Sequence, residues 1–302
     1  MPGTVRRWRP GYPLDLGRTL FPLRRGPADP SFHAGADGAY WRASRTPGGV
    51  GTLRIAAQAG EIEARAWGAG ADWLLEALPR LLGAEDDPAA LVVPPGPLRD
   101  AQRGHPGVRL ARTGLVMESL VPAILEQKVT TLEAYRAWRT LLRDFGTPAP
   151  GPQPGLRAAP SARDWATIPS WEWHRAGVDP KRSATVVRAA RIAPRMEEAG
   201  AFGHAEAFAR LTAVPGVGPW TAAETLQRAA GDPDAVSVGD FHLPNLVGWA
   251  LAGRPRSDDA QMLELLEPYR PQRHRLCRLI GLTGARAPRH GPRLSPEDHR
   301  GR

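Results

Sequence analysis

The sequence predicts a mainly α-helical protein in which a helical domain is preceded by a small α+β domain. Two observations support this: short runs of alternating apolar and polar residues lie between residues 38 and 67, and later in the chain apolar residues recur every three or four positions. A chain of 302 residues is long enough for two domains with separate cores. We expect the α+β domain over residues 1–110, the helical domain over residues 111–284 and a basic, frayed tail over residues 285–302.

The chain is strongly basic, with a formal net charge of +9 and a pI near 10.7. Such a charge favours polyanionic partners, with nucleic acid ahead of an anionic membrane surface. Of the 40 basic residues, only Lys128 and Lys181 are lysines. A GC-rich genome explains this arginine excess equally well, so composition alone does not establish a nucleic-acid function.

Cys277 is the single cysteine of the sequence, which excludes an internal disulfide and a cluster held by four thiolates, such as the usual iron–sulfur cluster. No run of about 18 apolar residues marks a membrane span. Arg6 and Arg7 resemble a twin-arginine signal, but no apolar stretch follows them. We therefore expect a soluble, cytoplasmic protein that does not bind membranes. Separate expectations are a monomer that requires no cofactor and, with nucleic acid as the partner, association with the nucleoid through DNA.

Three short runs with a period of two predict the strands of a small sheet: GAYWRASR, GTLRIAAQ and EIEARAW, separated by Gly and Asp-Gly turn signals. A helix is then predicted over residues 71–83, because leucines recur at helical spacing and Gly83 can cap its end. Pro79 should kink this helix, since proline lacks the backbone N–H that a helix interior needs.

The helical pattern begins in the stretch GLVMESLVPAILEQKVTTLEAYRAWRTLLRDFG, which starts at Gly114. Residues 147–162 are dense in Pro and Gly and predict an exposed loop inside the helical domain. An interdomain linker is the alternative. We favour the loop because helical patterning resumes directly after it.

Residues 204–214 and 219–231 predict two helices separated by a short Pro-Gly-Val-Gly segment. Gly216 and Gly218 let the turn close without Cβ clashes and leave backbone N–H groups at the start of the second helix, where they can bind phosphate. Backbone amides contact only the phosphodiester, so this grip would hold DNA of any sequence. The alternative is an ordinary αα-hairpin with a Gly-rich turn.

The pattern Leu-x-x-Val-Pro-Gly-Val-Gly-x-Trp-Thr-Ala, residues 211–222, resembles the helix-hairpin-helix of the DNA glycosylase superfamily. Asp240 lies 22 positions after Gly218, a spacing that resembles that of the family's catalytic aspartate; a helix N-cap is the alternative role. Within the superfamily the chain resembles the DNA-3-methyladenine glycosylase II family over most of its length. HPGVRLARTGLVMESLVPAILEQKVT is similar to that family's entry into the helical domain, and PYRPQRHRLCRLIGLTG to its last helix.

The resemblance implies a monofunctional DNA N-glycosylase of base-excision repair, which flips alkylated purines of the 3-methyladenine and 7-methylguanine type out of damaged double-stranded DNA and hydrolyses their bond to deoxyribose. A cationic base leaves easily, so one carboxylate, Asp240, would stabilise the sugar cation and orient or deprotonate the water. Trp220 and Phe241 resemble aromatic residues of the family's base pocket, with core packing as the alternative for each. Gly281 stands where that pocket often has another large aromatic residue.

The resemblance also implies which residues hold the DNA. Gln127 and Lys128 stand where the family places its minor-groove wedge, and a phosphate contact is the alternative for Lys128. Arg182 and Arg273 are further candidates for phosphate contacts. Contacts at the hairpin and the following helix are implied for Gly216, Val217, Gly218 and Thr221.

The hairpin of the family also binds a monovalent cation through main-chain carbonyls, which implies a structural Na or K ion at Thr212, Val214 and Val217. In bifunctional relatives, a lysine two residues after the second glycine forms a Schiff base with the sugar. This chain has Trp220 there, so no lyase activity is expected. Two alternatives stay open: a non-catalytic helix-hairpin-helix DNA-binding protein, and a glycosylase for oxidised or deaminated bases.

Overall fold

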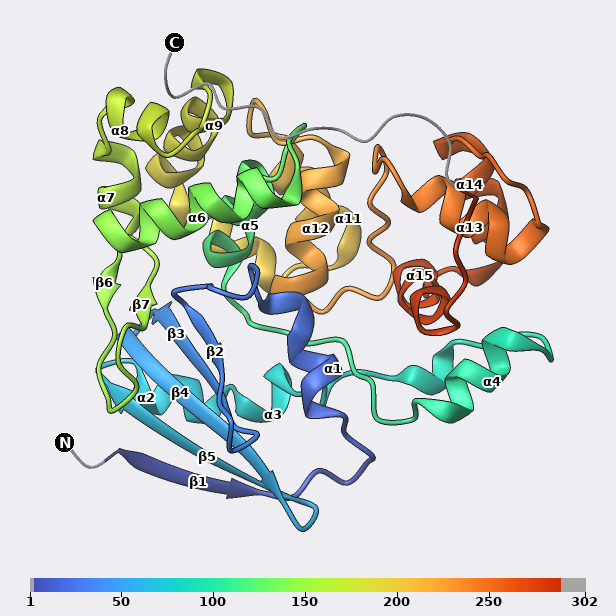
Figure 1. Cartoon of the computed structure of the whole chain (residues 1–302), viewed down its shortest axis with the longest axis horizontal. Coiled ribbons are helices and arrows are strands. Elements are labelled where there is room, and N and C mark those ends of the chain that lie inside the picture. Colours follow the sequence, from blue (N-terminus) through green and yellow to red (C-terminus); the bar gives the residue numbers. More distant parts are fainter. Residues whose placement is uncertain (1–2, 289–302) are drawn as a thin grey trace.

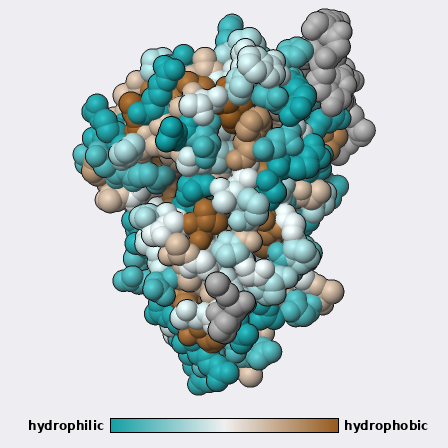
Figure 2. All heavy atoms as spheres, turned by 90° about the vertical axis from the view of Figure 1, so that its left-hand side faces the viewer, coloured by the Kyte–Doolittle hydropathy of each residue, from teal (hydrophilic) through white to brown (hydrophobic). Residues whose placement is uncertain are grey.

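The computed structural model describes residues 3–288 (Figure 1). In this part of the chain a sheet formed by the N-terminal strands lies below one group of helices, and a second group of helices stands beside the first. The face seen from the left of that view is mainly hydrophilic, with apolar side chains in small separate groups (Figure 2). Among the described residues, no helix is both long and apolar enough to cross a bilayer.

The N-terminal sheet is antiparallel, with the strand order β1-β5-β4-β3-β2. Ala59 and Gly60 join β4 to β5, and their φ angles of 49° and 79° suit a two-residue hairpin turn that matches the twist of the strands. The sequence pattern does not predict β1, a short, largely polar strand at the sheet edge. The strands are β1 (Thr4–Trp8), β2 (Phe32–Ala34), β3 (Tyr40–Thr46), β4 (Gly49–Gln58) and β5 (Glu61–Gly68).

Two short helices, α2 (Ala71–Glu76) and α3 (Leu78–Leu81), replace the single kinked helix predicted over residues 71–83. The break at Ala77 directly precedes the first turn of α3, which contains Pro79, so the predicted kink is confirmed. Leucines of both helices pack against apolar side chains of β4 and β5. The same core receives residues from α1 (Leu16–Leu20) and the 3-10 helix η1 (Phe21–Leu23).

The central helices surround one large apolar core. Three tryptophans of this core, Trp138, Trp165 and Trp173, stack with ring centroids 6.5 and 5.7 Å apart and join three successive helices. The helices are α5 (Val116–Leu125), α6 (Thr131–Phe145), α7 (Ala162–Thr167), α8 (Ser170–Arg175), α9 (Pro180–Arg191), α10 (Ala193–Glu197), α11 (His204–Thr212) and α12 (Pro219–Ala229), with the 3-10 helix η3 (Glu198–Gly200) between α10 and α11.

A separate apolar core forms between the C-terminal helices and a segment from early in the chain. Leu91, Val93 and Ala101 pack there with residues of α13, α14 and α15. The division between residues 110 and 111 and the end of the helical domain at residue 284 stay predictions, and residues 289–302 of the predicted frayed tail lie outside the described residues. The elements of this group are η2 (Pro88–Ala90), α4 (Pro97–Gly104), α13 (Leu243–Ala252), α14 (Asp259–Leu266), η4 (Glu267–Tyr269) and α15 (Arg273–Leu282).

The Pro- and Gly-rich segment 147–162 is more ordered than the exposed loop that its composition predicts. It contains the paired strands β6 (Thr147–Pro148) and β7 (Arg157–Ala158), and Figure 1 shows them extending from the helices towards the N-terminal sheet. Leu156 and Ala158 are buried against the stacked rings of Trp41 and Trp67, whose centroids lie 5.4 Å apart. The expectation of full exposure is therefore wrong at the base of this segment, because two sheet tryptophans provide an apolar surface for it.

Candidate active site

The hairpin connects α11 to α12 through residues 213–218, and its two glycines differ in their surroundings. Gly216 has a φ of +98°, and a Cβ there would lie 2.1 Å from Oγ1 of Thr185. Gly218 has an ordinary φ of −93°, and a Cβ there would meet no other described atom within 4 Å. Gly216 is therefore required by the turn itself, whereas Gly218 borders open space at the start of α12.

Side chains from two other helical segments hold this turn in place. Arg188 on α9 donates from Nε to the Pro215 carbonyl (3.0 Å). Gln127, directly after α5, donates from Nε2 to the Gly216 carbonyl (2.9 Å) and to Oγ1 of Thr221 (2.8 Å). The sequence did not single out Arg188, because one arginine among so many carries no distinguishing signal.

Gln127 and Thr221 are thus hydrogen-bonded to each other. Thr221 is buried, and its hydroxyl accepts the Gln127 amide. Val217 is also buried and belongs to the central core, and its N–H donates to the Val214 carbonyl (2.9 Å). DNA contacts of these residues stay predictions.

Lys128 stands at the exposed tip of the turn between α5 and α6, with a φ of +54°. A left-handed backbone is unfavourable for a lysine by about 1 kcal/mol or more. The capping box of Thr130 and Glu133 follows directly and fixes the start of α6. The turn therefore holds Lys128 outward from the helical body.

Asp240 is half-buried in the loop between α12 and α13, and its two oxygens have different partners. Oδ1 accepts the backbone N–H groups of His242 and Leu243, both at 2.8 Å, in the turn that leads into α13. Oδ2 accepts the indole N–H of Trp220 at 3.3 Å. The helix N-cap foreseen as the alternative role is wrong, because His242 is the N-cap residue of α13. Oδ1 supports the turn before that helix, while Oδ2 lies beside Trp220.

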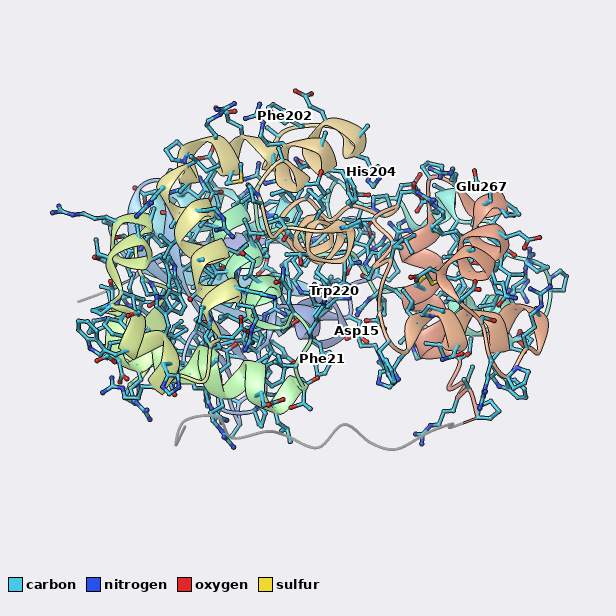
Figure 3. All side chains as sticks on the ribbon, turned by 90° about the horizontal axis from the view of Figure 1, so that it is seen from above. Asp15, Phe21, Phe202, His204, Trp220 and Glu267 are labelled. Atoms are coloured by element: carbon cyan, nitrogen blue, oxygen red, sulfur yellow. The ribbon has the colours of Figure 1, made fainter. Side chains whose placement is uncertain are left out.

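Trp220 lies near the middle of the molecule, between the central helices and the C-terminal group (Figure 3). Its side chain is partly exposed, whereas that of Phe241 is 69% exposed and packs edge-to-face on His242, with ring centroids 4.9 Å apart. The alternative that Phe241 packs in a core is therefore wrong. The structure brings Trp220 to Asp240, and Phe241 lies next to Asp240 in the chain without contributing to a core.

The structure places the three other predicted residues in different environments. Arg182 and Arg273 are both buried: Arg182 donates to the Leu125 carbonyl (2.6 Å), and Arg273 forms a two-pronged ion pair with Asp234. Their predicted phosphate contacts are wrong, because burial and internal partners engage both guanidinium groups. Gly281 is exposed on α15 and has open space where a Cβ would lie.

The candidate cation site lies at the turn of the hairpin. Thr212 ends α11, and Val214 and Val217 lie in the turn after it, so their carbonyl groups belong to one short connection. The Val214 carbonyl accepts the Val217 N–H, which leaves its second lone pair for a cation. A Na or K ion held there stays a prediction.

Sequence comparison finds relatives over part of the chain. No family model matches it. A stretch of 170 residues, 54% of the chain, is 33% identical to a protein from Mycobacterium tuberculosis described as a probable bifunctional transcriptional activator/DNA repair enzyme AlkA. The match covers 34% of that protein, so the chain spans about a third of the length of the curated relatives it matches.

Structural comparison covers nearly all of the chain. A 3-methyladenine DNA glycosylase from Archaeoglobus fulgidus superposes with a TM-score of 0.78 at 17% identity, over 92% of this chain and 98% of that one. An 8-oxoguanine glycosylase/lyase from Clostridium acetobutylicum, in its apo form, gives a TM-score of 0.73 at 12% identity, over 94% and 99% of the two chains. The two structures confirm the predicted fold class. The AlkA relative confirms the resemblance found in the sequence over 170 residues of the chain.

Proposed function

We propose that this protein is a monofunctional DNA glycosylase that removes alkylated purines from duplex DNA by hydrolysing their bond to deoxyribose. The observation that carries the proposal is the contact between Asp240 and Trp220 beside the helix-hairpin-helix turn. The AlkA relative supports an action on damaged DNA, and the Archaeoglobus structure supports the alkylated class. The Clostridium structure favours a second candidate, a glycosylase for oxidised purines.

The two oxygens of Asp240 suggest how the reaction would proceed. Because Oδ1 is engaged by two backbone N–H groups, Oδ2 would face the sugar and the attacking water. An alkylated purine carries positive charge and leaves without a strong general acid, so the carboxylate would act by stabilising the sugar cation and by orienting or deprotonating the water. The ring of Trp220 would favour the cationic base over its neutral counterpart.

The proposed partner is damaged double-stranded DNA, held chiefly through its phosphates. The net charge of +9 provides the long-range attraction. At short range, the exposed Lys128 would act as a wedge or a phosphate contact, and the open backbone at Gly218 would admit a phosphate. We infer a monomer that works at the nucleoid without a cofactor, apart from a Na or K ion at the hairpin.

The proposal is tested by incubating the purified protein with methylated, oxidised and deaminated duplexes and identifying the released bases. Release of 3-methyladenine or 7-methylguanine supports the alkylated class. Release of 8-oxoguanine alone would support the second candidate, and release of uracil alone would support a glycosylase for deaminated bases. Binding without release from any duplex would favour the non-catalytic alternative.

Replacing Gly218 with alanine is expected to leave the fold intact but to weaken binding to every duplex about tenfold, the equivalent of one charge-assisted hydrogen bond. The added Cβ would meet no described atom of the protein, so it would meet the phosphate instead. Binding titrations on unrelated sequences at several salt concentrations measure this, and affinity should fall steeply with salt.

Gly216→Ala is the matched comparison. It should lower the melting temperature, because its Cβ would collide with Thr185 and its φ is positive. Unchanged DNA affinity in Gly218→Ala, or a loss confined to one sequence, would contradict the hairpin contact.

The protein is expected to stop at the abasic site and leave the strand intact. Trp220 has no amine, and Asp240 cannot form an imine with the sugar. Borohydride trapping on a damaged duplex should therefore yield no covalent adduct, with a known bifunctional glycosylase as the positive control. An adduct that disappears in Lys128→Ala would identify that lysine as a lyase nucleophile instead.

A further inference from the structure

A line of three side chains runs along one face of α12 away from the candidate site. Trp220, Glu224 and Arg228 are spaced four residues apart, so they lie one above another on the helix. Trp220 contacts Asp240 at one end, and Arg228 donates from NH1 to Oε2 of Glu224 (2.7 Å) at the other. The face that carries the candidate pocket residue therefore also carries an ion pair whose two side chains are each 14% exposed.

Ser237 connects this ion pair to the loop that carries Asp240. Its hydroxyl donates to Oε1 of Glu224 (2.6 Å) and accepts the Gln227 amide (2.8 Å). Its carbonyl accepts the backbone N–H of Asp240 (3.2 Å). Ser237 is buried, and its hydroxyl is held by two residues of α12, Glu224 and Gln227.

The ionised state of Glu224 is maintained by its partners. Burial alone would raise the pKa of the Glu224 carboxyl, but Arg228 and the Ser237 hydroxyl together hold it below its ordinary value. The carboxylate is thus a stable acceptor for Ser237 at neutral pH. An ionised acceptor makes a stronger hydrogen bond than a neutral one.

The N-terminal segment anchors the far end of the line. Arg228 donates from Nε to the Pro22 carbonyl (2.9 Å), and Arg25 forms an ion pair with Glu126 (3.0 Å), one residue before Gln127. These two ion pairs, Arg25–Glu126 and Arg228–Glu224, also interact electrostatically with each other as one largely buried group. The segment around residues 22–25 therefore supports both the Asp240 loop and the turn that presents Lys128.

We propose that Arg228, Glu224 and Ser237 are positioning residues for Asp240, an inference that rests on the proposed glycosylase function. They fix the carbonyl that receives the Asp240 N–H, and with it the place of the carboxylate relative to Trp220. Small displacements of a reacting group cost large factors in rate without altering ground-state binding. The line of contacts thus acts on the chemical step and leaves DNA affinity unaffected.

The test compares Ser237→Ala with Ser119→Ala. Both remove a buried hydroxyl, but the Ser119 hydroxyl donates to a carbonyl of its own helical region (3.2 Å) and is remote from the Asp240 loop in its bonding. Single-turnover excision is measured on damaged duplex, and affinity on a duplex with a non-hydrolysable abasic analogue. Ser237→Ala is expected to lose about tenfold in rate and to keep its affinity, whereas Ser119→Ala keeps both.

Glu224→Gln and Glu224→Ala extend the test. Glutamine keeps an oxygen that accepts the Ser237 hydroxyl, so it should retain more of the rate than alanine at equal affinity. Amide hydrogen exchange over residues 235–243 is followed in all variants, and Ser237→Ala should accelerate it where Ser119→Ala does not. This readout needs no turnover, so it also tests the positioning role if the unaltered protein releases no base and the proposed function fails.

The inference is overturned if Ser237→Ala excises as fast as the unaltered protein, or if its loss matches that of Ser119→Ala. It is also overturned if affinity falls in parallel with rate, because a general structural defect would do that. Unchanged exchange over residues 235–243 in Ser237→Ala would reject it as well.

Discussion

Asp240→Asn is expected to lower the rate of base excision at least about a hundredfold, the usual scale for removing a key electrostatic group from an active site. The substitution keeps Oδ1, so the backbone N–H groups of His242 and Leu243 retain their acceptor and the turn into α13 keeps its hydrogen bonds. It replaces Oδ2 by an amide NH2 group, which can neither stabilise a sugar cation nor take a proton from water, and which no longer accepts the indole N–H of Trp220. Folding and affinity for DNA should therefore stay close to those of the unaltered protein.

Single-turnover excision, duplex binding and thermal unfolding measure these three properties. Asp259→Asn is the matched control, because both Asp259 carboxylate oxygens lie 3.1 Å from the N–H of Gly239, next to Asp240 in the same loop. The control should excise at nearly the normal rate. Full turnover in Asp240→Asn would remove Asp240 from the chemistry and leave only its hydrogen bonds to the turn before α13.

Asp234→Ala is expected to lower the free energy of unfolding by about 3–5 kcal/mol, the cost of leaving a buried charge without its partner. Asp234 is buried, and it accepts Nε (2.8 Å) and NH2 (2.6 Å) of Arg273, which is buried as well. Urea unfolding measures the loss. The control is Asp37→Ala, which breaks a more exposed ion pair with Arg54 and should cost far less, because solvent screens an exposed pair.

The same pair predicts a pH dependence. Burial would raise the pKa of the Asp234 carboxyl, but its hydrogen bonds with Arg273 outweigh burial and hold the pKa below its ordinary value. A carboxyl of lowered pKa contributes stability above the pKa of the unfolded chain and loses it as pH falls through the folded-state pKa. The unaltered protein should therefore lose more stability on acidification below about pH 4 than Asp234→Ala. Parallel stability curves would contradict this role of the pair.

Local patterns predicted much of the fold, because periodicity and turn residues act over short stretches. The alternating runs before residue 68 became strands β3, β4 and β5, and the break near Pro79 lies where proline chemistry places it. Strand β1 and the β6–β7 pair were not predicted. Both depend on partners distant in the chain, the edge of β5 for one and the stacked Trp41 and Trp67 for the other.

The candidate site shows the same division. The spacing between the hairpin and Asp240 led to the pair that the structure brings together, and Trp220 was assigned by its place two residues after Gly218. Neither spacing nor composition predicted the hydrogen bond between Ser237 and Glu224. That bond depends on how the chain turns between the two residues. Sequence also could not separate exposed arginines from buried ones, and so Arg273 was assigned to DNA although it binds Asp234.

The apolar core shared by α4 and the C-terminal helices has a consequence for how the chain folds during synthesis. Leu91, Val93 and Ala101 emerge from the ribosome long before Leu276 and Ile280, the residues that cover them. Contacts between such distant segments slow folding and leave apolar surface uncovered in the meantime. The ion pair between Asp86 and Arg275 joins residues 189 positions apart, so it also forms only after the last helix has been synthesised. The apolar side chains of this early segment therefore stay partly uncovered until the last helix has been synthesised. A chain that ended after α12 would leave them exposed to other unfolded chains.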